Sequence, residues 1–588
     1  MLLKVRLSTG EVFGDQAQRL RGLATGALTF AGQCRLDNRR ALCRRLGLPA
    51  EVSDAELFGA AYRTLGDAAH PAALLGDFAY ALYDNDQRRL WLVRDHLGVT
   101  PLYYHLSDDL CIVSDALDEI LAQPEIPRDL DEGVVAEWCL NGHVYNQTDT
   151  FHAAIKKVPR ATCLRLGAGP PQATTYWTVD AIAPLPAVDE HTYVEQLHDL
   201  LRTVIRDRLS ETGTLGAHSS GGLDSTPIAI LAGRACRAQG RAFYTYNWCQ
   251  PDAGDERECH EWTDARRVAQ DEGFHHHETD LSIASLEQSL LHHDPARDGT
   301  TMFEYERLVL AQATADGVTR IFSGFGGDEL LTSRSRDRHT DAIRAGRFLH
   351  ALRRLALESD PRQSPQLPRL ALNYARLLRH TWWPVPPERQ EWHRQQAARL
   401  AARQALLRPD FAAFAAAHHT PAGAYFRAER IAEKQRLMLD MGYHQERLES
   451  WAILGRRHGV RYVYPYLDKR VVEFAFALPA EWYYRQGRPR YLYTRAIGDA
   501  LPETLRTKSK RPESERVRQL IQRRHAALLR PVVAERVASA DSDYLATDRI
   551  LTQLRALARR DPADWHALMP EIRALSDAVL LLNVQASG

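Results

Sequence analysis

Hydrophobic positions in the first 178 residues fall in short runs separated by polar turns, a pattern that predicts strands joined by short connections. The tightest of these turns is Asp84-Asn85-Asp86, and the apolar runs on its two sides predict a hairpin. A proline-rich stretch at 181–187 then predicts a linker. The expected strands are 4–7, 28–31, 78–84 and 89–95.

Beyond residue 189 the pattern changes to helical spacing that alternates with short apolar strands. Apolar residues recur at helical spacing between 189 and 209, and again at 261–272. Alternating strands and helices predict an α/β domain with a parallel sheet. Residues 337–430 are rich in Ala, Arg and Leu and predict a helical insertion, which prolines near 384–387 interrupt. The expected strands of this part are 213–217, 242–248 and 318–322.

Length and composition limit the class of protein. A chain of 588 residues suggests about three or four domains or two large ones, and its 45% hydrophobic and 26% charged residues are ordinary for a soluble globular protein. The formal net charge of zero excludes a general attraction to nucleic acid or to an acidic membrane, and no apolar run approaches the ~20 residues of a membrane span. The eight cysteines are scattered without a C-x-x-C pair, and the chain starts without a signal-peptide pattern. We therefore expect reduced cysteines and a cytoplasmic location.

The stretch after the strand at 213–217 has the chemistry of a phosphate-binding turn. Glycines let backbone N–H groups approach an anion, and the start of the following helix adds partial positive charge. The hydroxyls of Ser220 and Ser225 can donate to phosphate oxygens, whereas Asp224 is an anion that could hold a magnesium ion. The alternative is an ordinary glycine turn between a strand and a helix. The predicted nucleotide-binding residues are Ser219, Ser220, Gly221, Gly222, Leu223, Asp224 and Ser225.

A second glycine-rich turn follows the strand expected at 318–322 and also carries acidic residues, Asp328 and Glu329. Two such loops at neighbouring strand ends would face one crevice, the usual ligand site of an open α/β sheet. Magnesium on a polyphosphate is commonly held by one or two carboxylates, which Asp224 and Asp328 would supply. The residues predicted to bind nucleotide in this second loop are Ser323, Gly324, Gly326 and Gly327.

The order Ser-Gly-Gly-Leu-Asp-Ser at 220–225 resembles the pyrophosphate loop of the ATP pyrophosphatases, and a Walker A pattern is excluded because the chain has no Gly-Lys pair. The two loops together resemble the synthetase domain of the asparagine synthetase family, in which the Ser-Gly of the second loop, here 323–324, also contacts the ribose. The resemblance implies ATP and Mg²⁺ as ligands. It also implies cleavage of ATP between its α and β phosphates, with a carboxylate activated as an adenylate.

Residues after the helical insertion resemble the C-terminal part of the same family. The matching pieces are 461–468, 474–479, Tyr491–Arg495, Leu501-Pro502 and Lys508-Ser509-Lys510. In that family a lysine past the Leu-Pro pair reaches the adenylate and pyrophosphate, and Lys510 lies at this spacing. A fixed ammonium group would stabilise the charge that builds on the α-phosphate and the leaving pyrophosphate. The alternative for Lys508 is a surface lysine.

The first 180 residues resemble the class II glutamine amidotransferase domain. This resemblance implies an Ntn-hydrolase-like α+β sandwich over 1–180, followed by the synthetase-like parallel-sheet domain over 190–588. The nucleophile of that family is a cysteine at position 2, where this chain has Leu2. The nearest cysteine, Cys34, is internal and lacks the free amine that activates an N-terminal nucleophile, so we expect no glutaminase activity. The matching pieces are 35–39, 76–79 and 94–104.

Two departures from the family narrow the expected reaction. Without the cysteine, no ammonia supply is built in. Phe325 stands where asparagine synthetases have a glutamate and β-lactam synthetases a tyrosine, and a phenyl ring cannot take a proton. Glu446 and Glu449, in a predicted helix before residue 461, are the candidate general bases. An enzyme that keeps adenylation, lacks ammonia generation and carries a helical insertion resembles the lasso peptide cyclases.

Those cyclases adenylate an Asp or Glu side chain of a core peptide, and the N-terminal amine of the same peptide closes the macrolactam. The resemblance implies a precursor peptide as substrate, and a leader peptidase and a leader-recognition protein as partners. A small-molecule amide or β-lactam synthetase and a non-catalytic nucleotide-binding scaffold remain alternatives, although the retained acidic loops argue against the scaffold. The basic stretch 389–408 is either a solvated helical face or a platform for a peptide or partner. The histidines at 275–277 favour a strand or loop over a zinc site.

Overall fold

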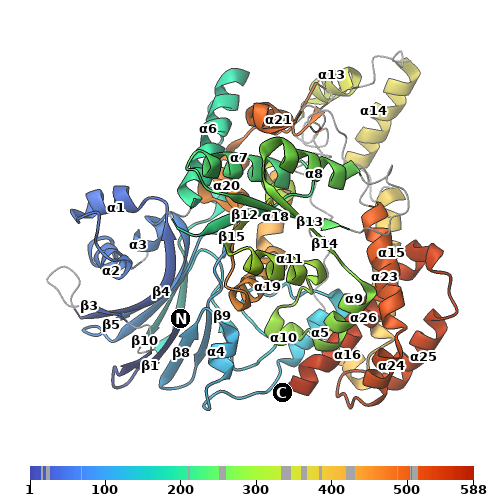
Figure 1. Ribbon diagram of the computed structural model, residues 1–588, viewed down its shortest axis with the longest axis horizontal. Coiled ribbons are helices and arrows are strands. Elements are labelled where there is room, and N and C mark those ends of the chain that lie inside the picture. The colour runs from blue at the N-terminus through green and yellow to red at the C-terminus, as the bar shows by residue number, and fades with distance from the viewer. Residues whose placement is uncertain are drawn as a thin grey trace.

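The structure is a computed structural model of the chain and has the mixed α/β architecture that the sequence predicted (Figure 1). Two antiparallel sheets come first along the chain, a parallel sheet follows, and helices make up most of the remainder. None of the helices in the described part of the chain is long and apolar enough to cross a bilayer. The structure describes residues 1–14, 18–20, 27–67, 69–167, 169–209, 212–249, 260–332, 343, 346–358, 367–382, 387–418, 431–486, 488–502, 505 and 514–587.

The N-terminal domain is a sandwich of a five-stranded and a six-stranded antiparallel sheet, with strand orders β2-β1-β8-β7-β9 and β11-β10-β6-β5-β4-β3. Apolar side chains between the two sheets form one core, and the outer face of the larger sheet packs against α1 and α2. The strands are β1 (Leu2–Arg6), β2 (Val12–Phe13), β3 (Gln18–Leu20), β4 (Leu28–Leu36), β5 (Gly76–Asp84), β6 (Arg89–Arg94), β7 (Tyr103–Leu106), β8 (Leu110–Ser114), β9 (Lys156–Lys157), β10 (Thr162–Gly167) and β11 (Gly169–Thr175). The helices are α1 (Arg39–Leu46), α2 (Asp54–Leu65), α3 (Ala69–Ala72), α4 (Leu117–Leu121) and α5 (Glu132–Asn141).

The predicted hairpin is present as β5 and β6, in which Asp84 pairs with Arg89. The buried Asp84 carboxylate closes the turn because its Oδ1 accepts hydrogen bonds from the backbone N–H groups of Asp86 and Gln87, both at 3.0 Å. An aspartate at this position is typical of tight turns, because its short side chain can bond the backbone two residues on.

The second domain contains a five-stranded parallel sheet with strand order β14-β13-β12-β15-β16. The chain builds outward from β12 in one direction and then returns to add β15 and β16 on the other side. The switch point of the sheet therefore lies between β12 and β15, where open α/β sheets usually bind ligands. The strands are β12 (Thr214–His218), β13 (Phe243–Cys249), β14 (His275–Asp280), β15 (Val318–Phe322) and β16 (Arg461–Val463).

Helices cover both faces of this sheet. One face packs mainly against α6 (Glu190–Arg208), α7 (Ser225–Arg237), α20 (Lys469–Ala477) and α21 (Tyr491–Ile497), and the other against α11 (Glu304–Ala315) and α19 (Tyr443–Arg457). Helix α6 confirms the helical spacing predicted for 189–209, and it begins after Asp189, whose Oδ1 accepts from the N–H of Thr192 at 2.7 Å. The remaining elements near the sheet are α8 (His260–Glu272), α18 (Ile431–Asp440), β17 (Tyr484–Arg485) and β18 (Arg488–Pro489).

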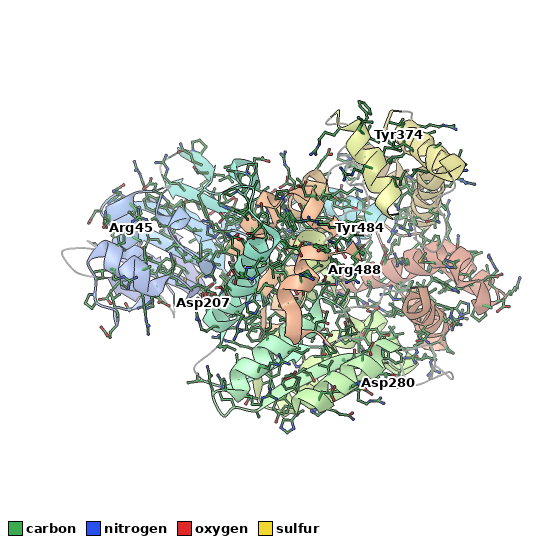
Figure 2. All side chains as sticks on the ribbon, turned by 90° about the horizontal axis from the view of Figure 1, so that it is seen from above. Arg45, Asp207, Asp280, Tyr374, Tyr484 and Arg488 are labelled. Atoms are coloured by element: carbon green, nitrogen blue, oxygen red, sulfur yellow. The ribbon has the colours of Figure 1, made fainter. Side chains whose placement is uncertain are left out.

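A layer of helices beyond the sheet has its own apolar core, to which α5 of the N-terminal domain also contributes. The expected insertion divides into two parts here: α15 and α16 join this core, whereas α13 and α14 pack on each other (Figure 1). Figure 2 places Tyr374 of α14 at the opposite end of the molecule from Arg45 of the N-terminal domain. These helices are α9 (Ile283–His292), α10 (Pro295–Asp298), α13 (Phe348–Glu358), α14 (Leu367–Trp382), α15 (Pro387–Gln404), α16 (Pro409–His418), α23 (Ser514–Leu528), α24 (Pro531–Ala538), α25 (Thr547–Leu557) and α26 (Trp565–Ser587).

A cluster of buried charges joins the two domains. Arg208, at the end of α6, donates to Asp37 of the N-terminal domain at 3.1 Å and also to Asp468. Arg470 donates to the same Asp468 at 2.9 Å. Burial by itself would raise the pKa of Asp468, but the two guanidinium groups more than offset this and hold the pKa well below its usual range.

Candidate functional site

The first predicted loop lies at the carboxyl end of β12, the central strand, and leads directly into α7. Gly221 has a φ of +72°, a left-handed conformation that disfavours other residues. The hydroxyls of Ser220 and Ser225 lie 2.9 Å apart, and the Ser225 hydroxyl also accepts from the Ser220 N–H at 3.0 Å. The Ser219 hydroxyl is buried without a hydrogen-bond partner among the described residues. The loop is therefore a compact turn with backbone and hydroxyl donors at a helix start.

The second predicted loop follows β15, the direct neighbour of β12, and packs against the first loop. A Cβ added to Gly324 would lie 2.6 Å from the backbone nitrogen of Ser225, and one added to Gly327 would lie 2.9 Å from Asp224 Oδ1. Only glycine allows this approach. Gly326, with a φ of +91°, precedes a short π-helical turn over Gly327–Leu331. The structure thus brings both acidic loops to one place at the switch point of the sheet.

Asp224 and Asp328, the two expected magnesium ligands, converge on one arginine that sequence analysis did not identify. The Arg490 guanidinium is buried; its Nη2 donates to Asp328 Oδ1 and lies 3.6 Å from Asp224 Oδ2. Arg490 is held in place because its Nε donates to the Thr332 carbonyl at 2.8 Å. The sequence offered one signal, since Arg490 directly precedes the Tyr491–Arg495 segment that we had matched to the family.

The carboxylate pair fits a magnesium ion. The two carboxylates lie side by side, because both approach Arg490 Nη2, and carboxylate oxygens are the ligands that Mg²⁺ prefers. Since Arg490 Nη2 fills the position between them, the ion would bind the pair beside the guanidinium and not in its place. Within the described residues there is no group of three or more His, Cys, Asp or Glu side chains that could enclose a metal. A magnesium ion at this carboxylate pair would therefore need the phosphates of the substrate to complete its coordination.

Two buried tyrosines contact the backbone carbonyls of the first loop. The hydroxyl oxygens of Tyr466 and Tyr493 lie 3.1 Å from the carbonyls of Asp224 and Leu223, respectively, and also contact each other. Because the two phenols carry two protons, two of these three hydrogen bonds form at a time. Burial raises the pKa of both phenols well above the usual value, so both stay protonated and remain donors. Their role is to fix the backbone of the loop.

Aromatic side chains surround Phe325 of the second loop on the face that α19 covers. Its ring contacts the rings of His444, Trp451 and Tyr464. The guanidinium of Arg447 lies 5.4 Å from the Phe325 ring centre and 5.0 Å from that of Trp451. Phe325 therefore packs within a buried aromatic cluster, with the Arg447 guanidinium beside its rings.

Glu446 and Glu449, the expected general bases, lie on the other face of α19 and contact the N-terminal domain. Glu446 accepts from the N–H of Val144 at 2.5 Å, and Glu449 accepts from Arg94 at 3.0 Å and Lys157 at 3.4 Å. The structure therefore does not bring these carboxylates to the loops, and we correct that assignment. The physical reason is the helical repeat: residues 444, 447 and 451 share the face toward Phe325, which excludes 446 and 449.

Three other sequence expectations concern residues outside the two loops. Lys508 and Lys510 lie outside the described residues, so the role expected for Lys510 stays a prediction. The histidines at 275–277 lie on strand β14, where His276 bonds the Thr245 hydroxyl at 2.9 Å. Cys34 lies in β4, and burial raises the pKa of its thiol well above the usual value, which disfavours a thiolate nucleophile there.

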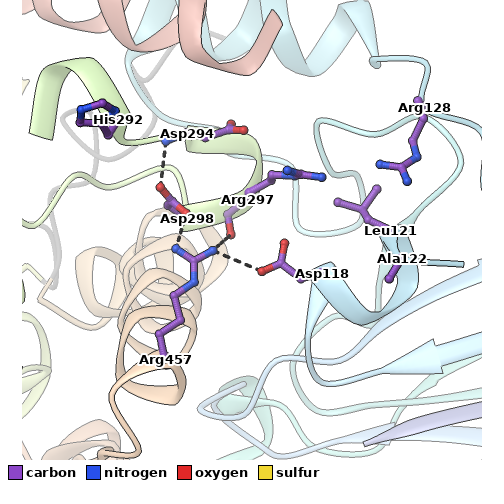
Figure 3. A pocket seen from close by; sticks show the side chains of 9 residues that line it. All are labelled: Asp118, Leu121, Ala122, Arg128, His292, Asp294, Arg297, Asp298 and Arg457. Atoms are coloured by element: carbon purple, nitrogen blue, oxygen red, sulfur yellow. Dashed lines mark hydrogen bonds and ion pairs between the residues drawn. The ribbon is translucent and has the colours of Figure 1, made fainter. Parts of the chain in front are cut away.

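A polar pocket of about 460 Å³ lies between the domains, and Figure 3 shows its side chains. Arg457 spans part of it, because its guanidinium bonds Asp298 and also Asp118 at 3.2 Å. None of the lining residues belongs to the two loops, so this pocket is separate from the site at the switch point. The lining residues are Asp118, Leu121, Ala122, Arg128, His292, Asp294, Arg297, Asp298 and Arg457.

Fold and site together define a two-domain α/β protein in which an antiparallel sandwich precedes a parallel sheet with paired acidic, glycine-rich loops. Comparison with known families agrees: the asparagine synthase model matches residues 196–578, and the glutamine amidotransferase domain model matches 37–177. The first match covers more than half of the chain. The chain therefore belongs to the asparagine synthase family.

Individual relatives are distant and match in part. Asparagine synthetase [glutamine-hydrolyzing] 3 of Bacillus subtilis is 26% identical over 30% of this chain and 28% of its own length. Asparagine synthetase [glutamine-hydrolyzing] of Rattus norvegicus is 28% identical over 54% of this chain and 56% of its own length. Amidase chry2 of Gibberella zeae is 25% identical over 47% of this chain and 42% of its own length. The chain thus spans about a quarter to just over half the length of these curated relatives.

Proposed function

We propose that the protein is an ATP-dependent amide ligase that forms AMP and pyrophosphate while activating a carboxylate as its adenylate. One observation carries the proposal: the two acidic loops meet at the switch point of a parallel sheet, where both carboxylates approach the Arg490 guanidinium. Membership of the asparagine synthase family supports the same reaction class.

In this proposal the chain's own residues bind and orient ATP. The backbone and hydroxyl donors of the first loop bind phosphate oxygens, while Ser323-Gly324 contacts the ribose. Asp224 and Asp328 hold Mg²⁺, which when bound would neutralise charge on the polyphosphate. The Arg490 guanidinium lies between these carboxylates and adds positive charge where the leaving pyrophosphate becomes more negative. We further propose that Lys510 supplies a second cation there.

The finer proposal is that the activated carboxylate is an Asp or Glu side chain of a core peptide. The peptide's own N-terminal amine then attacks it, and a macrolactam forms as in lasso peptide cyclases. Phe325 supports a departure from the asparagine synthetase reaction, since it stands where those enzymes have a glutamate and its ring cannot take a proton. A tethered amine needs no ammonia supply, which agrees with Leu2 and with the raised pKa of the partly buried Cys34 thiol. We therefore also propose that the protein has no glutaminase activity. A precursor peptide, a leader peptidase and a leader-recognition protein would complete the system in the cytoplasm.

ATP–pyrophosphate exchange tests the reaction class directly. We would measure exchange with a set of synthetic peptides that carry a free N-terminal amine and an internal Asp or Glu at varied spacing. Peptide-dependent exchange, followed by a product lighter by one water in mass spectrometry, is the expected result. Exchange with small carboxylic acids alone would favour a small-molecule amide or β-lactam synthetase.

No exchange with any carboxylate would overturn the ligase proposal and favour a nucleotide-binding scaffold. The site is tested with Asp224→Asn, which should lower the exchange. Its matched control is Asp199→Asn, which removes an exposed carboxylate on α6 and should leave exchange unchanged. Incubation with glutamine, and measurement of glutamate released, tests the absence of glutaminase activity in the same preparation.

A further inference from the structure

His218, the residue directly before the first loop, belongs to a buried hydrogen-bonded group that lies apart from the two loops and Arg490. His218 ends β12 and points to the sheet face that α11 covers, where its Nε2 lies 2.9 Å from Glu306 Oε1. The same oxygen accepts a hydrogen bond from the hydroxyl of Tyr462 on β16. The indole of Trp248, on β13, lies beside the imidazole with ring centres 5.6 Å apart.

Glu306 is fully buried, yet its carboxylate is only partly satisfied. Its Oε2 has no hydrogen-bond partner among the described residues, and no lysine or arginine there forms an ion pair with it. A buried carboxylate without a cation is costly, because the charge has lost its hydration and gained no counter-charge. The one neighbouring group that can become a cation is the His218 ring. Glu306 therefore holds the Nε2 side of the His218 ring and fixes the orientation of the imidazole.

The second nitrogen of the ring is available for chemistry. With Nε2 bonded to Glu306, the tautomer that donates to the carboxylate leaves the lone pair on Nδ1, and Nδ1 has no partner among the described residues. The side chain keeps 11% of its surface accessible. His218 thus has one nitrogen oriented by a buried carboxylate and the other open, next to the loop that would hold the adenylate.

We propose that His218 is the general base that accepts the proton of the attacking amine, and that Glu306 is the residue that orients it. This inference builds on the ligase function proposed above and adds the second half of its reaction. The amine nitrogen forms a bond to the carbonyl carbon of the acyl adenylate while the bond from that carbon to the phosphate oxygen breaks. AMP leaves with the electron pair, and the proton on the nitrogen passes to Nδ1 of His218.

The other side chains around this place are poorer bases. Burial lowers the pKa of His444 to about 4, so its imidazole is a weak proton acceptor. Phe325 carries no proton acceptor. Burial, and then the nearby Glu306, raise the pKa of Tyr462 and Tyr464 well above the usual value, so both phenols stay protonated. Arg447 is always charged. The charged or titratable groups that face His218 itself are Glu306 from α11 and Tyr462 from β16.

The test separates the two half-reactions in the full-length protein, with the peptide that supports exchange best. His218→Asn should keep ATP–pyrophosphate exchange within about threefold while ring closure falls ~10²–10⁴-fold, the usual worth of a general base. Hydroxylamine needs no base and should still trap the accumulated adenylate as a hydroxamate. Imidazole added to His218→Gly should restore part of the ring closure. The matched control is His191→Asn, at an exposed position on α6.

Glu306→Gln tests the orienting role. It should lower the ratio of ring closure to exchange about tenfold or more, and Glu306→Asp should recover part of that ratio. A purely structural role would lower both half-reactions together. Ring closure at the wild-type rate in His218→Asn would overturn the inference while leaving the ligase proposal intact. An unmutated protein that shows no exchange with any peptide would instead remove the ligase proposal itself.

Discussion

Glu306 and Glu449 are both buried glutamates on helices that cover the same face of the parallel sheet, but their partners differ. Glu449 has a cation at each oxygen, with Arg94 at 3.0 Å and Lys157 at 3.4 Å. Glu306 has only Tyr462 and the imidazole of His218 at one oxygen, and no partner among the described residues at the other. A fully paired charge maintains the contact between domains, whereas an incompletely paired one costs stability and is typical of a site where charge changes during a reaction.

The aspartates show the same contrast. Asp468 and Asp37 share Arg208 in the buried cluster between the domains. Asp224 and Asp328 share Arg490 at an edge that keeps access to solvent, since 38% of the Asp328 side chain is exposed. Both pairs of aspartates share an arginine, so ion pairing does not distinguish the structural pair from the pair in the proposed site. The two pairs differ in how accessible their carboxylates are to solvent.

The largest expected effect follows from removing one charge at the accessible pair. Asp224→Asn should lower ATP–pyrophosphate exchange about 10³-fold, because the ion that neutralises the phosphates loses one of its two carboxylate ligands. The melting temperature should change little, since Arg490 keeps its bond to Asp328. Exchange at near-normal rate in this variant would remove Asp224 from the site.

Removing the shared cation of the buried cluster should lower the stability of the protein, whereas Asp224→Asn should lower its activity. Arg208→Met leaves Asp37 and Asp468 with fewer cations inside the protein, and should lower the free energy of unfolding by about 3–5 kcal/mol. Chemical denaturation measures this change. Arg206→Met, on the same helix at a position where 72% of the side chain is exposed, is the control and should have no measurable effect. Equal stability of the two variants would contradict the structural role of the cluster.

The two glutamates give the sharpest comparison. Glu449→Gln should destabilise the protein by about 3 kcal/mol, because Arg94 and Lys157 lose their counter-charge, and should leave the ratio of ring closure to exchange unchanged. Glu306→Gln should lower that ratio at least tenfold with little loss of stability. Thermal unfolding and the two half-reaction assays, made on the same preparations, decide between them. If both variants changed stability and the ratio of ring closure to exchange to the same extent, Glu306 and Glu449 would not have different roles.

The smallest expected effect concerns pH. Because its pKa in the folded protein is lowered, ionised Asp468 contributes stability that is fully present above the unfolded pKa of about 4, and that is lost as the pH falls toward the folded value. The melting temperature should therefore decline between about pH 4 and pH 3. Asp468→Asn should flatten this decline. An unchanged profile would place the acid sensitivity elsewhere.

The sequence by itself determined the local features of this protein. Glycine, serine and aspartate at 219–225 and 323–328 specify turns, and Asp84 specifies the hairpin, because such residues act on backbone within a few positions of themselves. Alternating strand and helix patterns likewise predicted the parallel sheet. The turns and the hairpin depend on short-range geometry that any copy of the same segment would share, whereas the sheet was predicted only as a class of architecture.

Only the tertiary structure decided which buried charges meet. Sequence analysis selected Glu446 and Glu449 from a helix, but packing turned the opposite face of α19 toward Phe325. Sequence analysis also missed Arg490 and Glu306, which lie far along the chain from the first loop. Arg490 had only its place before the Tyr491–Arg495 match as a signal, and Glu306 had none. The physical reason is that the cost of a buried charge depends on the groups that surround it. Those groups come together through long-range packing, which residue spacing does not encode.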